Sequence, residues 1–417
     1  MLKTLKVRGF KSLDDVTLDF PRLTVLFGPN ASGKSNILDA VQALSRLATS
    51  RTLADALAEP IRGYPVEAFS FPAGGLAELL SGPSRRFALE ADLEVGQDPF
   101  KYRLSVEVEP LSAALSVCDE YLARLRKSSN EPTGVPAIEV VEDRIRLRRK
   151  SSGKPRFESL RQNFTMLSDL RLGAPEYRAI GLTRAELSAW RTYYLDPRVS
   201  MRVAQPPAEV RDIGVLGADI APFLYRLRAE SPKYFGAVRR TLSAIIPSVE
   251  DLVVDLDKRR GTLDILVRQD GTEFSSRIVS EGTLRVLAIC AIAANPWGGT
   301  LLAFEEPENG VHPRRIELIA QLLFSLAQTG DKQVVVTTHS PLLCDAVLRL
   351  ERAARLERGA RGVSALLNVR RRGSQTVVEP FPLTGPLFDD LDISKALTAA
   401  REDGLFESLL LRGFLDE

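Results

Sequence analysis

The stretch from Leu23 to Asn36, LTVLFGPNASGKSN, decides the fold of this 417-residue chain. Its first five residues form a continuous apolar run, which is typical of a strand buried on both faces of a sheet. From Lys34 onward the apolar residues recur with the period of a helix. Between strand and helix, Gly28 to Ser35 matches the pattern G-x-x-x-x-G-K-[ST]. A strand, a glycine-rich turn and a helix in this order predict a phosphate-binding loop in an α/β fold of the P-loop class.

The loop residues carry the chemistry that a polyphosphate needs. Glycines let backbone N–H groups turn inward onto phosphate oxygens, and the following helix presents its positive end to them. We expect Lys34 to bridge the β- and γ-phosphates and the Ser35 hydroxyl to bind Mg²⁺. An ordinary glycine turn before a helix is the less favoured alternative. The residues expected to hold the nucleotide are Gly28, Pro29, Asn30, Ala31, Ser32, Gly33, Lys34, Ser35 and Asn36.

Two acidic residues follow a second apolar strand. The run 300–304 is followed directly by Glu305 and Glu306. Adjacent acids at the end of a buried strand are costly unless a cation or solvent satisfies them. We expect Glu305 to belong to the Mg²⁺ shell through water, and Glu306 to polarise the attacking water. The alternative is a solvated acidic turn at the start of a helix.

A third buried strand, 333–338, leads into His339. A histidine at the end of a strand, beside Ser340 and Pro341, can hydrogen-bond a γ-phosphate and respond to its loss. A lone histidine is more often structural, so the role of His339 depends on the neighbouring motifs. We expect Lys34, Glu306 and His339 to be the catalytic residues.

The composition limits the class of protein. Hydrophobic residues make up 44% and charged residues 26%, and the net charge of +2 does not by itself indicate nucleic acid. Two histidines exclude a histidine-rich metal site, and three scattered cysteines favour a reducing compartment. No apolar run reaches the ~20 residues of a membrane span. We expect a cytoplasmic protein without a membrane partner.

Periodicity predicts the other elements. Two strands come first, within residues 2–20, and the final third alternates between helix and strand, which indicates a parallel sheet. The middle of the chain is predicted as strands 87–95 and 102–108, a helix from Ser116 to Arg126, a basic hairpin from Ile138 to Lys150, helices within 212–246, and strands 252–256 and 263–267. The expected divisions are an ATPase lobe at 1–96, an insert at 97–210, a helical lobe at 211–299, the ATPase core at 300–360 and a C-terminal extension at 361–417.

Four segments together resemble the ABC-type ATPases of the RecF, SMC and OLD group. They are FGPNASGKSN (27–36), SEGTLR (280–285), FEEPENGVHP (304–313) and TTHSPL (337–342). The resemblance covers residues 1–90 and 210–345. It implies an ABC-type ATPase head with a mixed or parallel sheet, a helical lobe and an α+β insert, and it favours ATP with Mg²⁺ as cofactors.

The resemblance also assigns a role to the segment Ser280, Glu281 and Gly282. In this group the corresponding signature motif contacts the γ-phosphate held by a second subunit, which implies an ATP-dependent homodimer. A helix capped by Ser280 would leave backbone N–H groups for an anion. A simple helix cap is the alternative interpretation.

The sequence departs from the group at three points. Glu305 stands where many relatives carry aspartate, no glutamine lies between Gln42 and Gln97 to mark the usual glutamine loop, and residues 97–210 match nothing known. OLD-type proteins carry a Toprim nuclease domain, which we do not expect in this polypeptide. The acids Asp389, Asp390 and Asp392 are interpreted as a solvated helix entrance.

Two functions remain open from the sequence. The first is an ATPase that acts on DNA in repair or genome (anti-phage) defence. Its basic clusters 144–150, 258–260 and 370–372 could follow phosphates, although each alone is more often a solvated face. The second is an ATP-driven regulatory subunit that controls an effector protein, such as a nuclease or toxin, through the insert. A transporter subunit is disfavoured, because the signature reads Ser-Glu-Gly-Thr-Leu.

Overall fold

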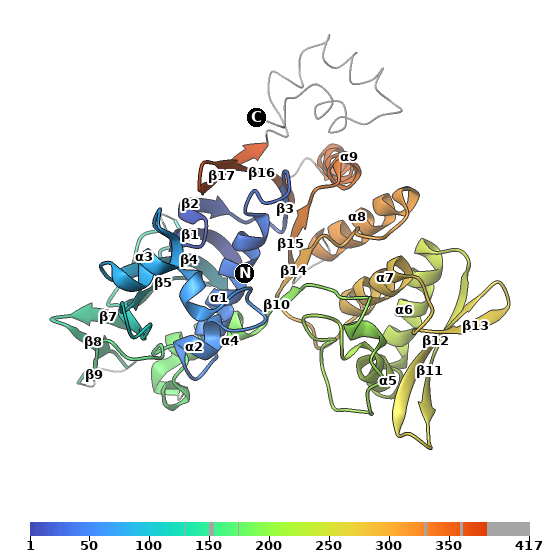
Figure 1. The fold of residues 1–417 in the computed structure, drawn as a ribbon, viewed down its shortest axis with the longest axis horizontal. Helices are drawn as coiled ribbons and strands as arrows, with labels where there is room; N and C mark the ends of the chain where they lie inside the picture. The colour runs from blue at the N-terminus through green and yellow to red at the C-terminus, as the bar shows by residue number, and fades with distance from the viewer. Residues whose placement is uncertain (129, 150–153, 174, 329–331, 359–361, 382–417) are drawn as a thin grey trace, which may run out of the picture. The chain divides into compact units, whose positions relative to one another are not determined.

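The computed structural model describes residues 1–128, 130–149, 154–173, 175–328, 332–358 and 362–381 (Figure 1). The chain forms two compact units. Unit 1 contains Met1–Pro21, Pro29–Trp190 and Asn368–Glu379, and unit 2 contains Arg22–Gly28, Arg191–Leu367 and, among the described residues that follow, Pro380 and Phe381. The acids at 389–392 lie outside the described residues. No helix in the described part of the chain has the length and apolar character that a membrane crossing requires.

Unit 1 is built on an antiparallel sheet of eight strands in the order β2-β1-β4-β5-β6-β7-β8-β9. Buried and less buried positions alternate along β4 and β5, as expected for strands with one face on a core. The strands are β1 (Leu2–Phe10), β2 (Leu13–Asp19), β4 (Arg85–Val95), β5 (Asp98–Val108), β6 (Leu115–Arg124), β7 (Ile138–Val141), β8 (Arg144–Leu147) and β9 (Arg156–Ser159).

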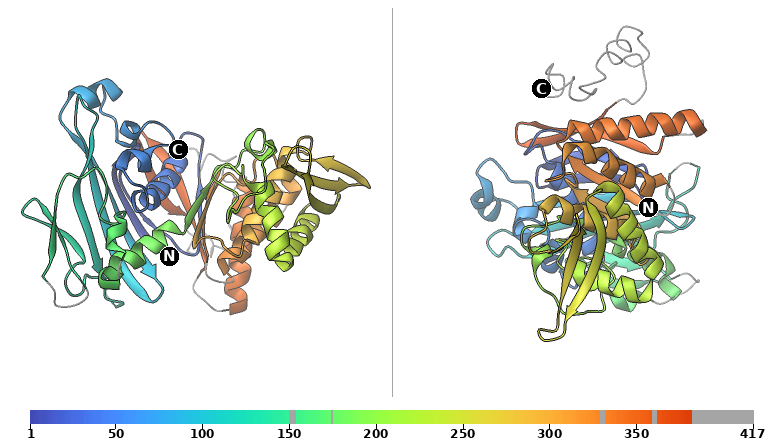
Figure 2. Two further views of the ribbon diagram at one scale, coloured as in Figure 1. Left: turned by 90° about the horizontal axis from the view of Figure 1, so that it is seen from below. Right: turned by 90° about the vertical axis from the view of Figure 1, so that its right-hand side faces the viewer.

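Helices of unit 1 pack on this sheet and on one another. Helix α1 (Lys34–Leu47) contacts α2 (Leu53–Leu57) and α4 (Arg178–Ser188), and α4 also contacts strands β4 and β6 (Figure 2). Residues 37–44 of α1 are all buried, so the middle of this helix is enclosed on every face, and its buried polar residues Asp39 and Gln42 lie among apolar neighbours. Helix α3 (Gly75–Ser81) is short and mostly exposed.

The helix predicted from Ser116 to Arg126 is wrong, because these residues form strand β6. The register of β6 against β5 shifts next to Val106, so Val117 and Glu120 are both buried although they are three residues apart. This spacing imitates a helical period. Glu120, a polar residue on the buried face, further conceals the alternation of the strand.

Unit 2 contains the parallel sheet that the alternation predicted. Strand β14 (Leu301–Glu305) pairs with β15 (Gln333–Thr338), which pairs with β3 (Leu23–Phe27), and all three run parallel. Every residue of β3 and β15 is buried, as in a sheet covered on both faces. Strand β10 (Trp190–Tyr193) continues this sheet beside β14, and the first residues of β16 (Ser364–Arg372) continue it beside β3.

The α-helices α5 to α9 and the antiparallel sheet β11-β12-β13 belong to the described part of unit 2 (Figure 1). Helix α7 (Glu281–Ala293) is buried around almost its whole circumference, so it is the centre of the core rather than a surface helix. Helix α6 (Pro232–Ile245) contacts α7, α8 (Pro313–Gln328) and strand β11 (Val249–Asp257) of the small antiparallel sheet. The remaining elements are α5 (Ile220–Glu230), β12 (Thr262–Gln269), β13 (Thr272–Ser275) and α9 (Pro341–Arg358).

The units divide the chain differently from the five ranges expected from the sequence. Strands β4 and β5 pair from Arg85 opposite Val108 to Val95 opposite Asp98, so residue 97 lies in the turn of one hairpin. The expected C-terminal extension contains β16 and β17 (Gln375–Phe381), and the residues 368–379 belong to unit 1.

Candidate nucleotide-binding site

The backbone of the predicted phosphate loop adopts conformations that few side chains permit. The φ angles are +148° at Gly28, +62° at Ala31 and +105° at Gly33, immediately before α1 begins at Lys34. A Cβ atom at Gly33 would lie 2.0 Å from Oγ1 of Thr376. Glycine is therefore required at position 33 both for its φ angle and for the space it leaves.

Lys34 is folded back over its own loop. Its side chain is 95% buried, and Nζ donates a hydrogen bond of 2.8 Å to the carbonyl oxygen of Pro29. No side chain caps α1 among the described residues, and its first turn contains no acid. A helix start with no acid in its own first turn is a suitable place for a phosphate group.

A chain of hydroxyl groups supports the loop from behind, within unit 1. The Oγ atom of Ser12 lies 2.7 Å from Oγ1 of Thr376 and accepts a hydrogen bond of 2.7 Å from Nδ2 of Asn36. Thr376 in turn donates to the carbonyl oxygen of Ser32 at 3.0 Å. Ser12 and Thr376 were not predicted from the sequence, and nothing near Thr376 in the chain signals its role.

The turn that carries Ser12 is also tied to α1. Asp39 on α1 is completely buried, and its Oδ2 accepts hydrogen bonds from Nζ of Lys11 at 2.6 Å and from Arg62 at 3.3 Å. A buried carboxylate needs such partners to remain charged. A hollow of about 560 Å³ within unit 1 adjoins this cluster, and Asn36 of the predicted site is part of its lining.

In unit 2, the predicted catalytic residues Glu306 and His339 lie together. Nδ1 of His339 lies 3.1 Å from Oε1 of Glu306, within ion-pair distance, and Nδ2 of Asn309 donates to Oε2 at 2.7 Å. The backbone of Glu306 has φ +44° and its N–H donates to the carbonyl oxygen of Thr337 at 3.0 Å. Glu305 is the last residue of β14 and stands opposite Thr337 of β15.

A third acid of the same segment, Glu308, is the most deeply buried of the three. It is 4% exposed, and Oγ1 of Thr338 donates to its Oε1, while Oε2 has no hydrogen-bond partner among the described residues. Burial raises the pKa of Glu308 above its usual range. The sequence did not single out Glu308, although its position three residues after Glu305 was a visible signal.

The predicted signature segment begins helix α7. Oγ of Ser280 accepts a hydrogen bond of 3.2 Å from the N–H of Thr283, so Ser280 is the N-cap that the sequence suggested. Glu281 pairs with Arg198 at 2.8 Å. A Cβ atom at Gly282 would lie 2.2 Å from the carbonyl oxygen of Gly310, so the start of α7 packs closely on the loop after β14.

The structure thus places each predicted residue in one of two groups. Residues 29–36 form the loop and first turn of unit 1, and Gly28 ends the segment of unit 2 that precedes them. In unit 2, Glu306 lies beside His339, and Gly282 packs against the loop that contains Glu308. Arg285, also on α7, has a pKa lowered by burial, and its Nε atom has no hydrogen-bond partner in the described part of the chain.

The residues expected to hold Mg²⁺ fit that ion chemically. The Ser35 hydroxyl and the Glu305 carboxylate supply oxygen atoms, which are the ligands that Mg²⁺ prefers. No cluster of three or more His, Cys, Asp or Glu residues able to hold a metal occurs in the described ranges. Water and phosphate oxygens would have to complete the shell, as is usual for Mg²⁺ bound with a nucleotide.

One protein family matches most of the chain. The family described as "AAA domain, putative AbiEii toxin, Type IV TA system" matches residues 23–345. This range contains the phosphate loop, the signature segment, the acids after β14 and His339.

Curated relatives are similar over a short segment. The chromosome partition protein Smc of Rhodopirellula baltica is 59% identical over 44 residues, which are 10% of this chain and 4% of that protein. The DNA replication and repair protein RecF of Picosynechococcus sp. is 46% identical over 56 residues, 13% of this chain and 14% of the relative. The chain therefore matches only a small part of either relative's length.

A solved structure is similar over nearly the whole chain. It is the crystal structure of the Smc head bound to the C-winged helix domain of ScpA, with a TM-score of 0.54 at 14% identity. The match covers 92% of this chain and 98% of that one. This similarity concerns the fold, and it confirms the predicted P-loop ATPase head.

Proposed function

The chain belongs to the AAA-domain family whose model spans residues 23–345, and it is an ABC-type P-loop ATPase of the RecF/SMC group; from this premise we propose that it binds and hydrolyses ATP, pairs with a second copy around ATP, and acts on DNA. ATP hydrolysis is general in this group. For this chain, we propose the dimer and the DNA.

The conformation of the phosphate loop carries the proposal. Ala31 and Gly33 turn their backbone into left-handed conformations, and Lys34 is buried with its ammonium group on the loop carbonyl of Pro29. The Oγ atom of Ser32 is buried and has no hydrogen-bond partner among the described residues. A polyphosphate would give this hydroxyl and the loop N–H groups their acceptors, and would draw Lys34 from Pro29 to the β- and γ-phosphates.

We assign the hydrolytic step to the cluster in unit 2. Glu306 accepts a proton from the attacking water, and its hydrogen bond from Asn309, together with the imidazole of His339 at 3.1 Å, holds the carboxylate in one orientation. His339 also donates toward the γ-phosphate. Ser35 and Glu305 would hold Mg²⁺, which when bound neutralises charge on the phosphate oxygens.

The second copy is proposed from the signature segment. Ser280 caps α7, and Glu281 is held by Arg198, so the first turn of α7 is ordered and its N-terminal end is defined. We propose that Ser280, Glu281 and Gly282 meet the γ-phosphate bound to the partner copy. Gly282 and Gly310 pack so closely that movement of the loop after β14 would move this surface.

DNA is the favoured substrate, and an effector protein is the second candidate. The relatives that match are named for DNA repair and chromosome partition. The family description names a toxin system, and the similar Smc head is bound to a domain of another protein, which supports the effector alternative. In that alternative, ATP hydrolysis would control a separate nuclease or toxin.

The Glu306→Gln variant tests the ATPase proposal. The amide keeps the shape of the side chain but cannot accept the proton, so ATP should still bind, turnover should fall by at least about 10²-fold, and the ATP-bound dimer should persist. Turnover by phosphate release and mass by light scattering measure both effects. Lys34→Ala is the control that should neither bind ATP nor dimerise. Normal hydrolysis by Glu306→Gln contradicts the assignment.

DNA binding separates the two candidate roles. The DNA proposal expects binding that requires ATP and weakens steeply as salt rises, because counterions are released from the phosphates. The effector alternative expects no such binding, and instead a stable complex with a second protein whose activity depends on ATP.

A further inference from the structure

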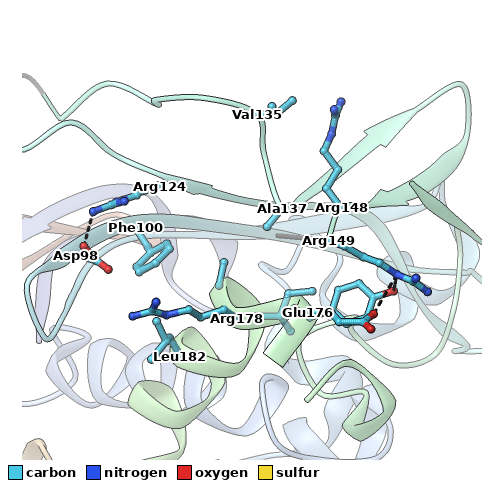
Figure 3. A pocket seen from close by; sticks show the side chains of 13 residues that line it. Asp98, Phe100, Arg124, Val135, Ala137, Arg148, Arg149, Glu176, Arg178 and Leu182 are labelled. Carbon is cyan, nitrogen blue, oxygen red and sulfur yellow. Dashed lines mark hydrogen bonds and ion pairs between the residues drawn. The ribbon is translucent and has the colours of Figure 1, made fainter. Parts of the chain in front are cut away.

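A second hollow lies wholly inside unit 1, away from every motif residue of the nucleotide site (Figure 3). It lies between the sheet and helix α4, and its volume is about 360 Å³. Four arginines and two acids line it, so the charged lining carries a net +2. The charged residues are Asp98, Arg124, Arg148, Arg149, Glu176 and Arg178.

Three of these arginines already have acidic partners. Arg124 pairs with Asp98 at 2.5 Å, Arg149 with Glu176 at 3.3 Å, and Arg148 with Glu139, which is outside the lining, at 2.9 Å. Arg149 also donates to the hydroxyl of Tyr177 at 3.3 Å. These pairs hold the guanidinium groups at the rim in defined positions, and each group keeps N–H donors that the pair does not use.

Arg178 differs from the other three. It is exposed, and among the described residues no hydrogen bond or ion pair holds it. It is the first residue of α4, whose first turn contains no acid, so a cation stands at the positive end of a helix. This placement is unfavourable for the isolated protein, and an anion in the hollow would compensate it.

The remaining lining is apolar. Phe100, Ile180 and Leu182 belong to it, and in Figure 3 the Arg178 side chain runs beside Leu182 toward the side of the hollow where Arg124 and Phe100 lie. An occupant therefore needs a flat or apolar body and an anionic group. The volume is at the lower end of the range of about 300–1,000 Å³ that small-molecule sites occupy.

We propose that this hollow binds one nucleotide unit, with its phosphate on Arg178 and Arg124 and its base against the apolar lining. Guanidinium groups match phosphate oxygens with paired N–H donors, which a single ammonium group cannot do. The unit can be a free nucleotide or the end of a nucleic-acid strand, since both present the same phosphate and base. The site does not depend on ATP hydrolysis at the phosphate loop.

Binding to the full chain tests this site. With the phosphate loop saturated by ADP and Mg²⁺, calorimetry measures the affinity for thymidine monophosphate, for a 5′-phosphorylated thymidine hexamer and for the same hexamer without that phosphate. Arg178→Ala should weaken binding by at least about tenfold, the effect of losing a charge-assisted hydrogen bond. Arg51→Ala, which removes an exposed arginine of unit 1 outside the hollow, should change it by less than about twofold.

The pattern of results identifies the source and can overturn the site. Binding of the monophosphate assigns a free nucleotide, and binding of only the phosphorylated hexamer assigns a strand end. Thermal melting should show Arg178→Ala folded and at least as stable as the wild type. The inference fails if no probe binds, if Arg51→Ala weakens binding as much as Arg178→Ala, or if Lys34→Ala abolishes binding that Arg178→Ala retains, since the ligand would then be at the phosphate loop.

Discussion

Nδ1 of His339 lies 3.1 Å from Oε1 of Glu306, although the two residues follow different strands of the parallel sheet. A second link connects the same two loops, because Thr338 donates to the buried carboxylate of Glu308. The loops after β14 and β15 are therefore joined twice within unit 2.

His339→Ala should slow ATP hydrolysis by about 10–100-fold while ATP still binds. Without the imidazole, Glu306 loses one of the two side chains that lie against its carboxylate. His312→Ala is the matched control, because His312 is exposed, is the only other histidine in the sequence, and forms no hydrogen bond or ion pair with Glu306 within the described residues. Phosphate release at saturating ATP measures the effect. Equal rates for the two variants would contradict the role given to His339.

Gly33→Ala should destroy nucleotide binding and destabilise the protein. Its Cβ atom would have to displace Thr376, whose Oγ1 holds the carbonyl oxygen of Ser32, and φ would remain at +105°. Gly96→Ala is the control, since Gly96 has φ +63° and open space around it, and should cost only about 1 kcal/mol. Urea unfolding and nucleotide titration compare them. Similar losses of stability in both variants would show that the positive φ angle alone, and not the contact with Thr376, causes the loss.

Thr338→Val should lower the free energy of unfolding by about 1–3 kcal/mol, because it leaves the buried carboxylate of Glu308 without its donor. The substitution keeps the volume of the side chain. Thr272→Val, on an exposed strand position of the same unit, should change stability by less than about 0.5 kcal/mol. Denaturant unfolding of both variants measures the difference, and a Thr338→Val protein as stable as the wild type would count against the link.

The stability of unit 1 should fall as the pH rises from about 5 to 8. Burial raises the pKa of Glu120 from 4.5 to about 7, although the N–H groups of Met166 and Leu167 donate to it. A folded-state pKa above the unfolded value means that the proton is bound more tightly in the native protein. Its contribution is therefore complete at low pH and is lost as the pH rises through 7, by up to about 3 kcal/mol.

Glu120→Gln provides the comparison for this effect. The amide cannot titrate, so the difference in unfolding free energy between wild type and variant should shift in favour of the variant as the pH rises. Urea unfolding at several pH values between 5 and 8 measures this difference. Parallel pH curves for the two proteins would show that Glu120 does not titrate in that range.

Most of the elements around the predicted site follow from local pattern. Strand β3 is five consecutive apolar residues, and helix α1 begins at Lys34, as the spacing of its apolar residues predicted. The predicted fold class is confirmed by the parallel sheet of unit 2 and by the similar Smc head. Continuous apolar runs and helical periods depend only on neighbouring residues, so they can be recognised in the sequence without knowledge of the fold.

The errors and omissions of the sequence prediction arise where contacts between residues far apart in the chain determine the structure. Strand β6 was predicted as a helix because a register shift against β5 and the buried Glu120 conceal its alternation. Glu120 is tolerated there only because the N–H groups of residues 166 and 167 reach it. No local propensity contains that information, and pairing with a neighbouring strand overrides local preference.

The sequence by itself determined the strand, the glycine-rich turn and the helix of the phosphate loop, together with the acids and the histidine that end the neighbouring strands. These features depend on residue type and short spacing. Only the tertiary structure decided that Thr376 supports Ser32 from 344 residues away, that Glu308 is buried beneath Thr338, and that four arginines surround a separate hollow. Such contacts form when the chain folds to bury its apolar faces, because burial brings together polar groups that are remote in sequence and leaves them no partner except one another.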